Sequence, residues 1–272
     1  MTEPATIASK YGIFTERSKQ RLDLTYDYED SAILAFARSV AALDMSHFVD
    51  IGANIGCYSI YVSGVASVRK ILAFEPAPHA FEELKKNILL QERKDIFSPF
   101  PLALSDHKKQ TTFRIVSEMS GANRIEDDTA GGNYIEVQCE PLDSLLPIKN
   151  KKIALKIDVE GHELQTLAGM ENLLKNNACF IQVECLEEAL AAKCKRILQT
   201  LGYRFVFSLR DDYIFLSQTL ADSLDAIQNI YFKAVQDDLN ELLALKTYKR
   251  QTVANSLNML LKNGYPYDPV LR

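Results

Sequence analysis

The chain has 272 residues, of which 47% are hydrophobic and 25% are charged, and its net charge at pH 7 is −5. This balance is typical of a globular protein with a sizeable core, and the lack of a basic block argues against an extended nucleic-acid-binding face. No apolar run approaches the ~20 residues that a membrane span needs. The five scattered cysteines have no Cys-x-x-Cys spacing, and the N-terminus has no signal pattern, so we expect a cytoplasmic protein without a disulfide framework.

Taken in chain order, residues 1–46 are predicted to form an N-terminal segment. It is polar and irregular up to about Asp27 and continues into a helix that packs on the core. Runs of apolar residues that end in turn or acidic residues predict strands at residues 47–50, 70–75, 96–104, 111–116, 134–139, 152–159, 180–184, 203–207 and 213–216. Helical spacing predicts helices at residues 29–43, 58–66, 78–93, 163–175 and 187–201.

This alternation predicts an open α/β sheet over residues 47–217. The strands at 111–116 and 134–139 are expected to be an inserted antiparallel pair, and the two prolines near residue 100 place the third strand at an edge. Residues 218–272 are expected to be a C-terminal helical extension of two leucine-rich helices. Their apolar face suggests a homodimer.

The first strand ends in an acid and leads into a glycine loop, Asp50-Ile51-Gly52-Ala53-Asn54-Ile55-Gly56. Open α/β sheets bind nucleotide-like ligands at such a turn, where glycines let the backbone approach the ligand. An acid here is poorly placed beside a pyrophosphate but suits a cationic amino group, such as that of S-adenosylmethionine. The absence of Gly-x-Gly-x-x-Gly also argues against a nicotinamide oxidoreductase.

The second strand ends at Glu75-Pro76, where a carboxylate can accept both ribose hydroxyls of a bound nucleoside. The alternative is that both acids lie in ordinary strand–helix turns. A third acidic stretch, Lys156-Ile157-Asp158-Val159-Glu160-Gly161-His162-Glu163, follows a central strand. It therefore places Asp158, Glu160 and His162 at the ligand-binding edge of the sheet.

These stretches resemble the FkbM-type family of S-adenosylmethionine-dependent methyltransferases. The matching residues are 49–56, 74–76, 103–106, 156–163, Leu167 and Gly169, within a match over about 48–216. The resemblance implies a Rossmann-like, seven-stranded class I methyltransferase sheet at residues 47–217 that binds S-adenosylmethionine. It also implies methyl transfer to a hydroxyl, typically of a sugar in a glycan or glycolipid or of a polyketide-like product.

Carried over by position, the resemblance assigns the methionine end of the cofactor to the glycine loop, the ribose to Glu75 and the region near the adenine to Ser105 and Asp106. The cofactor-binding residues it implies are Asp50, Gly52, Ala53, Asn54, Gly56, Glu75, Pro76, Ser105, Asp106 and Asp158.

An alcohol is a poor nucleophile near pH 7, so its proton must be removed. His162 suits a general base, because its ordinary pKa is about 6.5, and Asp158 or Glu160 could orient it or accept the proton instead. The acceptor is expected to contact Asn123 and Arg124 of the long loop at residues 120–133, and Glu184. A competing hypothesis places a magnesium or calcium ion on Asp158, Glu160 and Glu184.

The sequence therefore predicts a methyltransferase that acts on a sugar hydroxyl with S-adenosylmethionine. A divalent metal stays possible, although the sequence does not require one. Two alternatives stay open. One is an O-methyltransferase that modifies a polyketide-like small molecule. The other is a non-catalytic, methyltransferase-like scaffold that acts through its C-terminal helices, although such a scaffold has no chemical reason to keep Asp50, Glu75 and Asp158 together.

Overall fold

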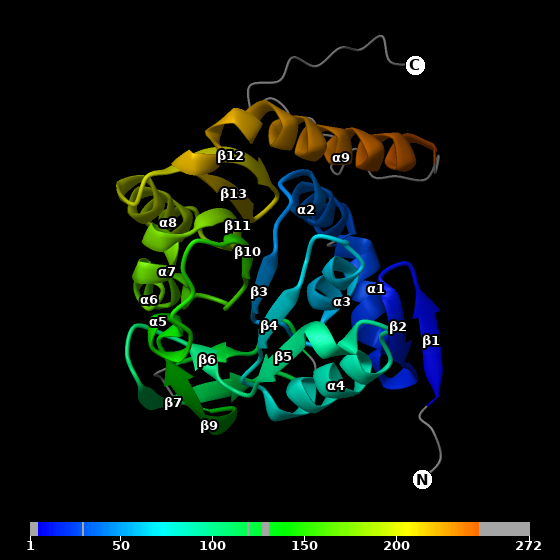
Figure 1. Cartoon of the computed structure of the whole chain (residues 1–272). Helices are drawn as coiled ribbons and strands as arrows, with labels where there is room; N and C mark the ends of the chain where they lie inside the picture. The colour runs from blue at the N-terminus through cyan, green and yellow to red at the C-terminus, as the bar shows by residue number, and fades with distance from the viewer. Residues whose placement is uncertain (1–4, 29, 119, 127–130, 245–272) are drawn as a thin grey trace.

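A seven-stranded sheet forms the centre of the computed structural model, which describes residues 5–28, 30–118, 120–126 and 131–244 (Figure 1). The strand order is β12-β13-β11-β10-β3-β4-β5. Its strands are β3 (His47–Ile51), β4 (Lys70–Phe74), β5 (Phe97–Phe100), β10 (Lys152–Ile157), β11 (Ala178–Glu184), β12 (Tyr203–Leu209) and β13 (Asp212–Ser217). The strands β10, β11, β3, β4 and β5 pair in parallel, whereas β13 runs antiparallel to both of its neighbours. The predicted α/β sheet is confirmed.

Helices cover both faces of this sheet, which explains why its central strands are mostly apolar. Successive side chains point to opposite faces, so Phe48 of β3 packs in one core and Val49 in the other. The first core holds α2 (Asp30–Ala42), α3 (Cys57–Ser63), α4 (Pro78–Leu89) and α9 (Leu224–Ala244). The second holds α5 (Leu142–Leu145), α6 (Glu163–Ala168), α7 (Glu171–Asn176) and α8 (Glu188–Thr200).

One predicted helix is divided in two. The sequence predicts a single helix over residues 163–175, but α6 ends at Ala168 and α7 begins at Glu171. Gly169 lies at the break, where a Cβ would come within 1.9 Å of the Ser105 carbonyl oxygen. The close approach of the Ser105 backbone accounts for a glycine at this point.

The inserted antiparallel pair is confirmed and is part of a larger sheet. The strands β7 (Lys109–Ile115) and β9 (Asn133–Glu140) pair antiparallel, and β8 (Arg124–Ile125) and β6 (Ala103–Leu104) complete the order β6-β9-β7-β8. The third strand predicted at 96–104 is therefore divided between the two sheets. Its first part, β5, lies at the edge of the main sheet, as its prolines predict.

The N-terminal segment was predicted to be irregular, and this prediction is wrong. It forms a hairpin of β1 (Thr6–Ser9) and β2 (Gly12–Thr15), followed by η1 (Glu16–Ser18) and α1 (Lys19–Tyr28). The two strands are too short to show a clear alternation of apolar residues, so the sequence pattern misses them. Phe14 and Leu22 are buried in the core that α2 and α3 share, which fixes the segment to the domain.

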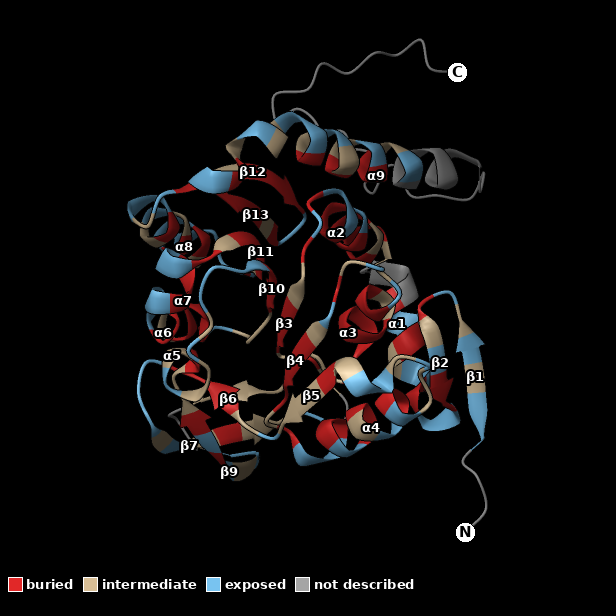
Figure 2. Cartoon of the chain, viewed as in Figure 1, coloured by how far each residue is buried: buried red, intermediate tan, exposed pale blue. Residues whose placement is uncertain are grey.

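The helix α9 lies across the domain's own core, and its buried residues face inward (Figures 1 and 2). It contacts α2 and β12 and buries Ile227, Tyr231 and Val235. It follows η3 (Gln218–Ser223), and the remaining short turn, η2 (Lys94–Ile96), precedes β5. The second predicted C-terminal helix lies outside the described residues, and the homodimer stays a prediction. Within the part of the chain that the structure describes, no helix is long and apolar enough to cross a membrane.

Candidate functional site

Two adjoining cavities open at the carboxyl ends of β3, β4 and β10, where open α/β sheets bind ligands. The larger cavity has a volume of about 590 Å³ and the smaller one about 300 Å³, within the range of small-molecule sites. Four residues line both cavities: Arg21, Gly52, Asn54 and Asp158. The two cavities therefore form one elongated site.

The glycine loop forms the wall between the cavities. Gly52 has a φ of +83°, and a Cβ there would come within 1.8 Å of the Asp158 carbonyl oxygen. Only glycine fits this contact, because both the backbone conformation and the space exclude a side chain. Ala53 lines the smaller cavity and Gly56, with a φ of +92°, lines neither. The loop thus brings its bare backbone to the site, as the sequence predicts.

Glu75 holds the glycine loop in place from the end of β4. Its two carboxylate oxygens accept hydrogen bonds of 2.8 Å from the backbone amides of Asn54 and Ala77. The residue is 5% exposed, and burial raises its pKa to about 7 despite these amides. Glu75 and Pro76 both line the larger cavity. The two backbone amides therefore hold the Glu75 carboxylate in place at the wall of the larger cavity.

Asp50 lies at the end of β3 beneath the smaller cavity, where it is 2% exposed. One of its oxygens accepts hydrogen bonds from the Ser59 amide, at 3.1 Å, and the Ser59 hydroxyl, at 2.6 Å. Ser59 is in the first turn of α3, where amides lack partners within the helix. Asp50 thus ties β3 to α3 while its carboxylate faces the cavity.

The predicted base, His162, is buried and precedes α6. Its Nε2 lies 2.9 Å from the Ser105 hydroxyl, which donates a 2.9 Å hydrogen bond to Asp106. His162 lines the larger cavity, but neither Ser105 nor Asp106 lines either cavity. The structure therefore joins three predicted site residues in one chain of hydrogen bonds and brings one of them to the cavity wall.

The predicted catalytic carboxylates differ in position. Asp158 lines both cavities, whereas Glu160 lines neither. Glu160 has a left-handed backbone, with a φ of +53°, which is uncommon for a residue with a side chain. Burial, followed by the charges of Glu184 and Glu163, raises the Glu160 pKa to about 7. Asp158 is thus the predicted carboxylate at the junction of the two cavities.

Behind Asp158 lies a buried ion network that the sequence patterns did not reveal. Lys156 is 3% exposed, and its Nζ lies 2.9 Å from Asp212 and 3.0 Å from Glu184. Burial alone would lower the Lys156 pKa, but these two carboxylates raise it well above its usual value. The ammonium also lies 5.3 Å from the centre of the Tyr58 ring, and Tyr58 lines the smaller cavity.

Hydrogen bonds extend this network to α9. The Gln182 amide donates to the Tyr58 hydroxyl at 2.8 Å, and the Tyr231 hydroxyl donates to the Gln182 oxygen at 2.9 Å. Lys156 and Gln182 are polar residues in the middle of largely apolar strands. Because polar residues are seldom buried without partners, their positions were the one feature of the sequence that could have predicted a buried polar network.

Glu184 was predicted to contact substrate or a metal, and its structural partner is Lys156. Among the described residues, no group of three or more His, Cys, Asp and Glu side chains is placed to hold a metal ion. Asn123 lines the larger cavity, although its amide group is bonded to the backbone of Val116 and Ser117. Arg124 pairs with Glu126 at 3.0 Å and lines neither cavity.

Arg21 of α1 is a cavity residue that the sequence patterns did not reveal at all. It lines both cavities, yet it lies in a segment that the sequence describes only as polar. No local motif surrounds it, so its role depends on the tertiary fold alone.

A parallel sheet with one reversed strand near its end, and a glycine-loop cavity at the carboxyl ends of its strands, define a Rossmann-like methyltransferase. Residues 50–205 match the methyltransferase FkbM domain, which is more than half of the chain. The protein belongs to the FkbM methyltransferase family, and the predicted resemblance is confirmed.

The comparisons also give individual relatives. Hexuronic acid methyltransferase AglP of Haloferax volcanii is 32% identical over 149 residues, covering 50% of this chain and 54% of the relative. Methyltransferase sdnD of Sordaria araneosa is 26% identical over 154 residues, covering 45% and 60%. The matches thus span little more than half of these relatives. A crystal structure of methyltransferase FkbM from Methylobacillus flagellatus is 14% identical, with a TM-score of 0.48 over 64% of this chain and 44% of that one.

Proposed function

We propose that the protein is an S-adenosylmethionine-dependent O-methyltransferase that acts on a sugar hydroxyl of a glycan or glycolipid precursor. The observation that carries this proposal is the pair of adjoining cavities with Asp158 at their junction. One cavity can hold an adenosine and the other an amino acid, and the reacting group of this cofactor lies between these two parts. When bound, the cofactor supplies a methyl group on a positively charged sulfur.

The residues of the larger cavity fit an adenosine. Glu75 offers carboxylate oxygens to the ribose hydroxyls, and Phe74, Leu104, Phe113 and Ile125 give the cavity an apolar lining that suits a purine. The smaller cavity has Asp50 and the bare glycine loop. An acid beside an open backbone suits a cationic amino group better than a phosphate. The residues present therefore fit the cofactor.

We further propose that Asp158 accepts the proton of the acceptor hydroxyl. A general base must lie within reach of the reacting atoms before its pKa is considered, and of Asp158, Glu160 and His162 only Asp158 lines both cavities. His162 then positions the wall of the larger cavity through Ser105.

A sugar acceptor is supported by the name of one relative, a hexuronic acid methyltransferase. The test is a titration of the purified protein with S-adenosylhomocysteine, followed by assays with a panel of neutral sugars and uronic acids as methyl acceptors. Cofactor binding together with methylation of a sugar hydroxyl supports the proposal. If the protein methylates an apolar polyphenol or polyketide but none of the sugars, the proposed sugar acceptor is wrong.

Asp158→Asn should lower kcat about 10²- to 10⁴-fold, the usual contribution of a general base. The affinity for S-adenosylhomocysteine should change less than about fivefold, because the substitution keeps the shape of the side chain. The matched variant His162→Asn should keep kcat within about tenfold of the wild type. Single-turnover rates and calorimetric titrations measure both quantities. A large loss of kcat in His162→Asn, with Asp158→Asn active, contradicts the assignment.

The affinity for S-adenosylhomocysteine should also fall as the pH is lowered. The Glu75 carboxylate accepts the ribose hydroxyls, and its pKa is about 7 instead of the ordinary 4.5. Above pH 7 most of the Glu75 side chains are ionised, and the affinity for S-adenosylhomocysteine should be constant. Below pH 7 protonation of Glu75 competes with ligand binding, so the dissociation constant should rise by up to about tenfold for each pH unit. Calorimetric titrations between pH 5.5 and pH 8.5 test this.

The control for this pH dependence is Glu160→Gln, which removes a second carboxyl with a pKa of about 7 that lines neither cavity. This variant should keep the pH dependence of binding, whereas Glu75→Gln should remove it. A pH dependence that survives in Glu75→Gln assigns the titration to another group.

A further inference from the structure

Three side chains join the smaller cavity to α9, which lies outside the family domain at residues 50–205. The Tyr231 hydroxyl of α9 donates to the Gln182 oxygen, and the Gln182 amide donates to the Tyr58 hydroxyl. Gln182 and Tyr231 are fully buried and line neither cavity. Tyr58 lines the smaller cavity but not the larger one. The hydrogen bonds therefore lead from α9 to one part of the cavity wall.

Gln182 can transmit a position because its planar amide group is held at both ends. The amide oxygen can only accept a hydrogen bond and the amide nitrogen can only donate one. A turn of the Gln182 amide away from Tyr231 therefore also takes its donor away from Tyr58. Such a turn costs free energy inside a core, because it leaves buried polar groups without partners. The Tyr231 hydroxyl thus restrains the Tyr58 side chain.

The other contacts of Tyr58 act on its ring. The Phe36 ring meets it edge-on, with 5.5 Å between the ring centres, and the Lys156 ammonium lies 5.3 Å from its centre. Ring contacts of this kind tolerate small shifts, whereas a hydrogen bond requires a defined distance and angle. The bond from Gln182 therefore adds a directional restraint at the hydroxyl end of the side chain.

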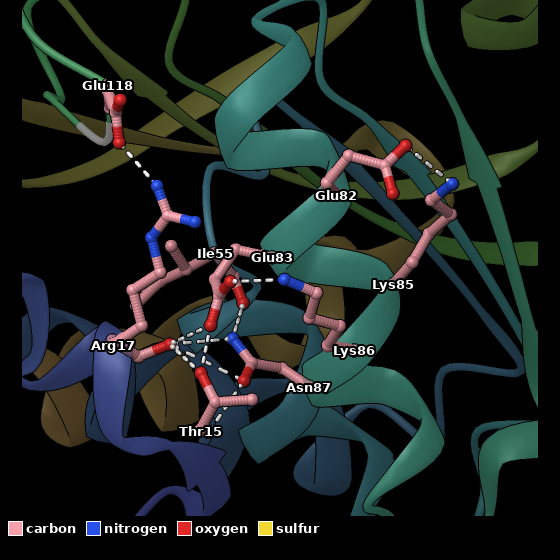
Figure 3. A network of polar contacts seen from close by, with 10 residues as sticks. Thr15, Arg17, Ile55, Glu82, Glu83, Lys85, Lys86, Asn87 and Glu118 are labelled. Carbon is pink, nitrogen blue, oxygen red and sulfur yellow. Dashed lines mark hydrogen bonds and ion pairs between the residues drawn. The ribbon is translucent and has the colours of Figure 1, made fainter. Parts of the chain in front are cut away.

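The glycine loop has a separate support, which Figure 3 shows. The Asn87 amide of α4 donates a 3.0 Å hydrogen bond to the Ile55 carbonyl oxygen, and the Asn87 oxygen accepts a 2.9 Å hydrogen bond from the Thr15 amide. Ile55, like Tyr58, lines the smaller cavity. The helix α4 contacts β5 and α9 contacts β12, the two outer strands of the main sheet. The smaller cavity is therefore supported from both ends of the sheet, and a change at Tyr231 leaves the support of the loop intact.

We propose that Tyr231 is a positioning residue of the cofactor site, which holds Tyr58 against the amino-acid part of S-adenosylmethionine through Gln182. This inference rests on the proposed function, which assigns the smaller cavity to the amino acid and the larger one to the adenosine. Because Tyr58 does not line the larger cavity, the Tyr231 hydroxyl supports the binding of the amino acid and not that of the adenosine. The cofactor site then depends on a helix beyond the family domain.

The test compares two ligands that differ in the amino acid. S-adenosylhomocysteine carries the whole amino acid, whereas 5′-methylthioadenosine carries only the nucleoside and a methylated sulfur. Tyr231→Phe removes one hydroxyl and should raise the dissociation constant of S-adenosylhomocysteine about 5- to 10-fold. The dissociation constant of 5′-methylthioadenosine should change less than about twofold. Calorimetric titration of the full chain measures both.

A double-mutant cycle tests the path through Tyr58. Tyr58→Phe removes the hydroxyl that accepts the Gln182 amide and should also weaken S-adenosylhomocysteine selectively. If Tyr231 acts through Tyr58, the double variant should bind within about twofold of Tyr58→Phe alone. Additive losses would mean that Tyr231 acts by another route and would overturn the proposal.

The matched control is Tyr203→Phe. Tyr203 is also buried, lines neither cavity and donates a 2.9 Å hydrogen bond to the Leu174 carbonyl oxygen in the second core. This variant should lose a similar amount of stability but keep both affinities. Gln182→Met interrupts the same hydrogen bonds at their middle, and it should show the selective loss if Tyr231→Phe melts too low to be titrated. Thermal melting checks that each variant is folded.

Equal weakening of both ligands by Tyr231→Phe would overturn the proposal, because the hydroxyl would then only support the fold. Unchanged affinity for both ligands, or the same selective loss in Tyr203→Phe, would overturn it as well. A wild-type protein that binds neither ligand would refute the proposed function itself, which the first titration shows before any variant is made.

Discussion

Lys156→Met should lower the free energy of unfolding by about 3–5 kcal/mol, the usual cost of removing one partner of a buried ion pair. The substitution keeps the apolar stem but leaves the carboxylates of Asp212 and Glu184 without their cation. The Asp212 side chain is 12% exposed and that of Glu184 28% exposed, so water replaces little of the lost interaction. Urea denaturation at pH 8 measures the change.

Three comparisons separate this effect from a general loss of charge. Lys149→Met removes an exposed lysine near the start of the same strand and should change stability by less than about 0.5 kcal/mol. Adding Asp212→Asn to Lys156→Met should restore part of the stability, because it removes one unpaired charge. The deficit should also be smaller at pH 5, since the Asp212 pKa, which burial raises to about 6, allows that group to become neutral. A loss below about 1 kcal/mol at pH 8 contradicts the account.

Glu75→Gln should weaken the binding of S-adenosylhomocysteine about 100-fold, or roughly 2.7 kcal/mol. In the wild type, both carboxylate oxygens accept backbone amides, at 2.8 Å each. Glutamine keeps one acceptor and turns a donor toward an amide that is itself a donor, so one of the two contacts is lost. The negative charge that we propose faces the ribose hydroxyls is lost as well. Calorimetric titration gives the affinity directly.

The matched control for this substitution is Glu82→Gln, which makes the same change on the exposed side of α4, where Glu82 pairs with Lys85. Its affinity should equal that of the wild type. A Glu75→Gln variant that binds within about threefold of the wild type would show that the carboxylate does not contact the cofactor.

The sequence predicted the parts of this protein whose causes are local. A strand, a turn and a helix start are encoded within a dozen or so neighbouring residues, so the residue pattern alone was enough to place Asp50, Gly52 and Glu75 at one edge of the sheet. The same reasoning placed His162 near the site, whereas Ser105 and Asp106 were placed there by the resemblance to the family. It did not show that of these three only His162 reaches the cavity wall, since that depends on side-chain orientation.

The parts that the sequence did not predict depend on contacts between distant residues. Tyr58 and Gln182 meet across 124 positions and Lys156 and Asp212 across 56, and no local pattern joins such pairs. Arg21 reaches the cavity wall because the N-terminal segment is fixed to the domain, for example by Asn87 and by the core residue Phe14. A pattern of short strands, such as β1 and β2, carries too few alternating residues to predict this placement.

The position of β13 also affects the order in which the chain can complete its sheet during synthesis. This strand lies between β11 and β12, although it follows both of them in the sequence. A nascent chain that has reached the end of β12 at Leu209 therefore has β11 as an open sheet edge, with buried apolar residues such as Ile181 and Val183 next to unpaired backbone. Such an edge is a site for aggregation. The edge of β11 is covered only once Ser217 has left the ribosome. Pairing of the segment from Asp212 to Ser217 with β11 therefore ends the period in which the incomplete chain can aggregate through this edge.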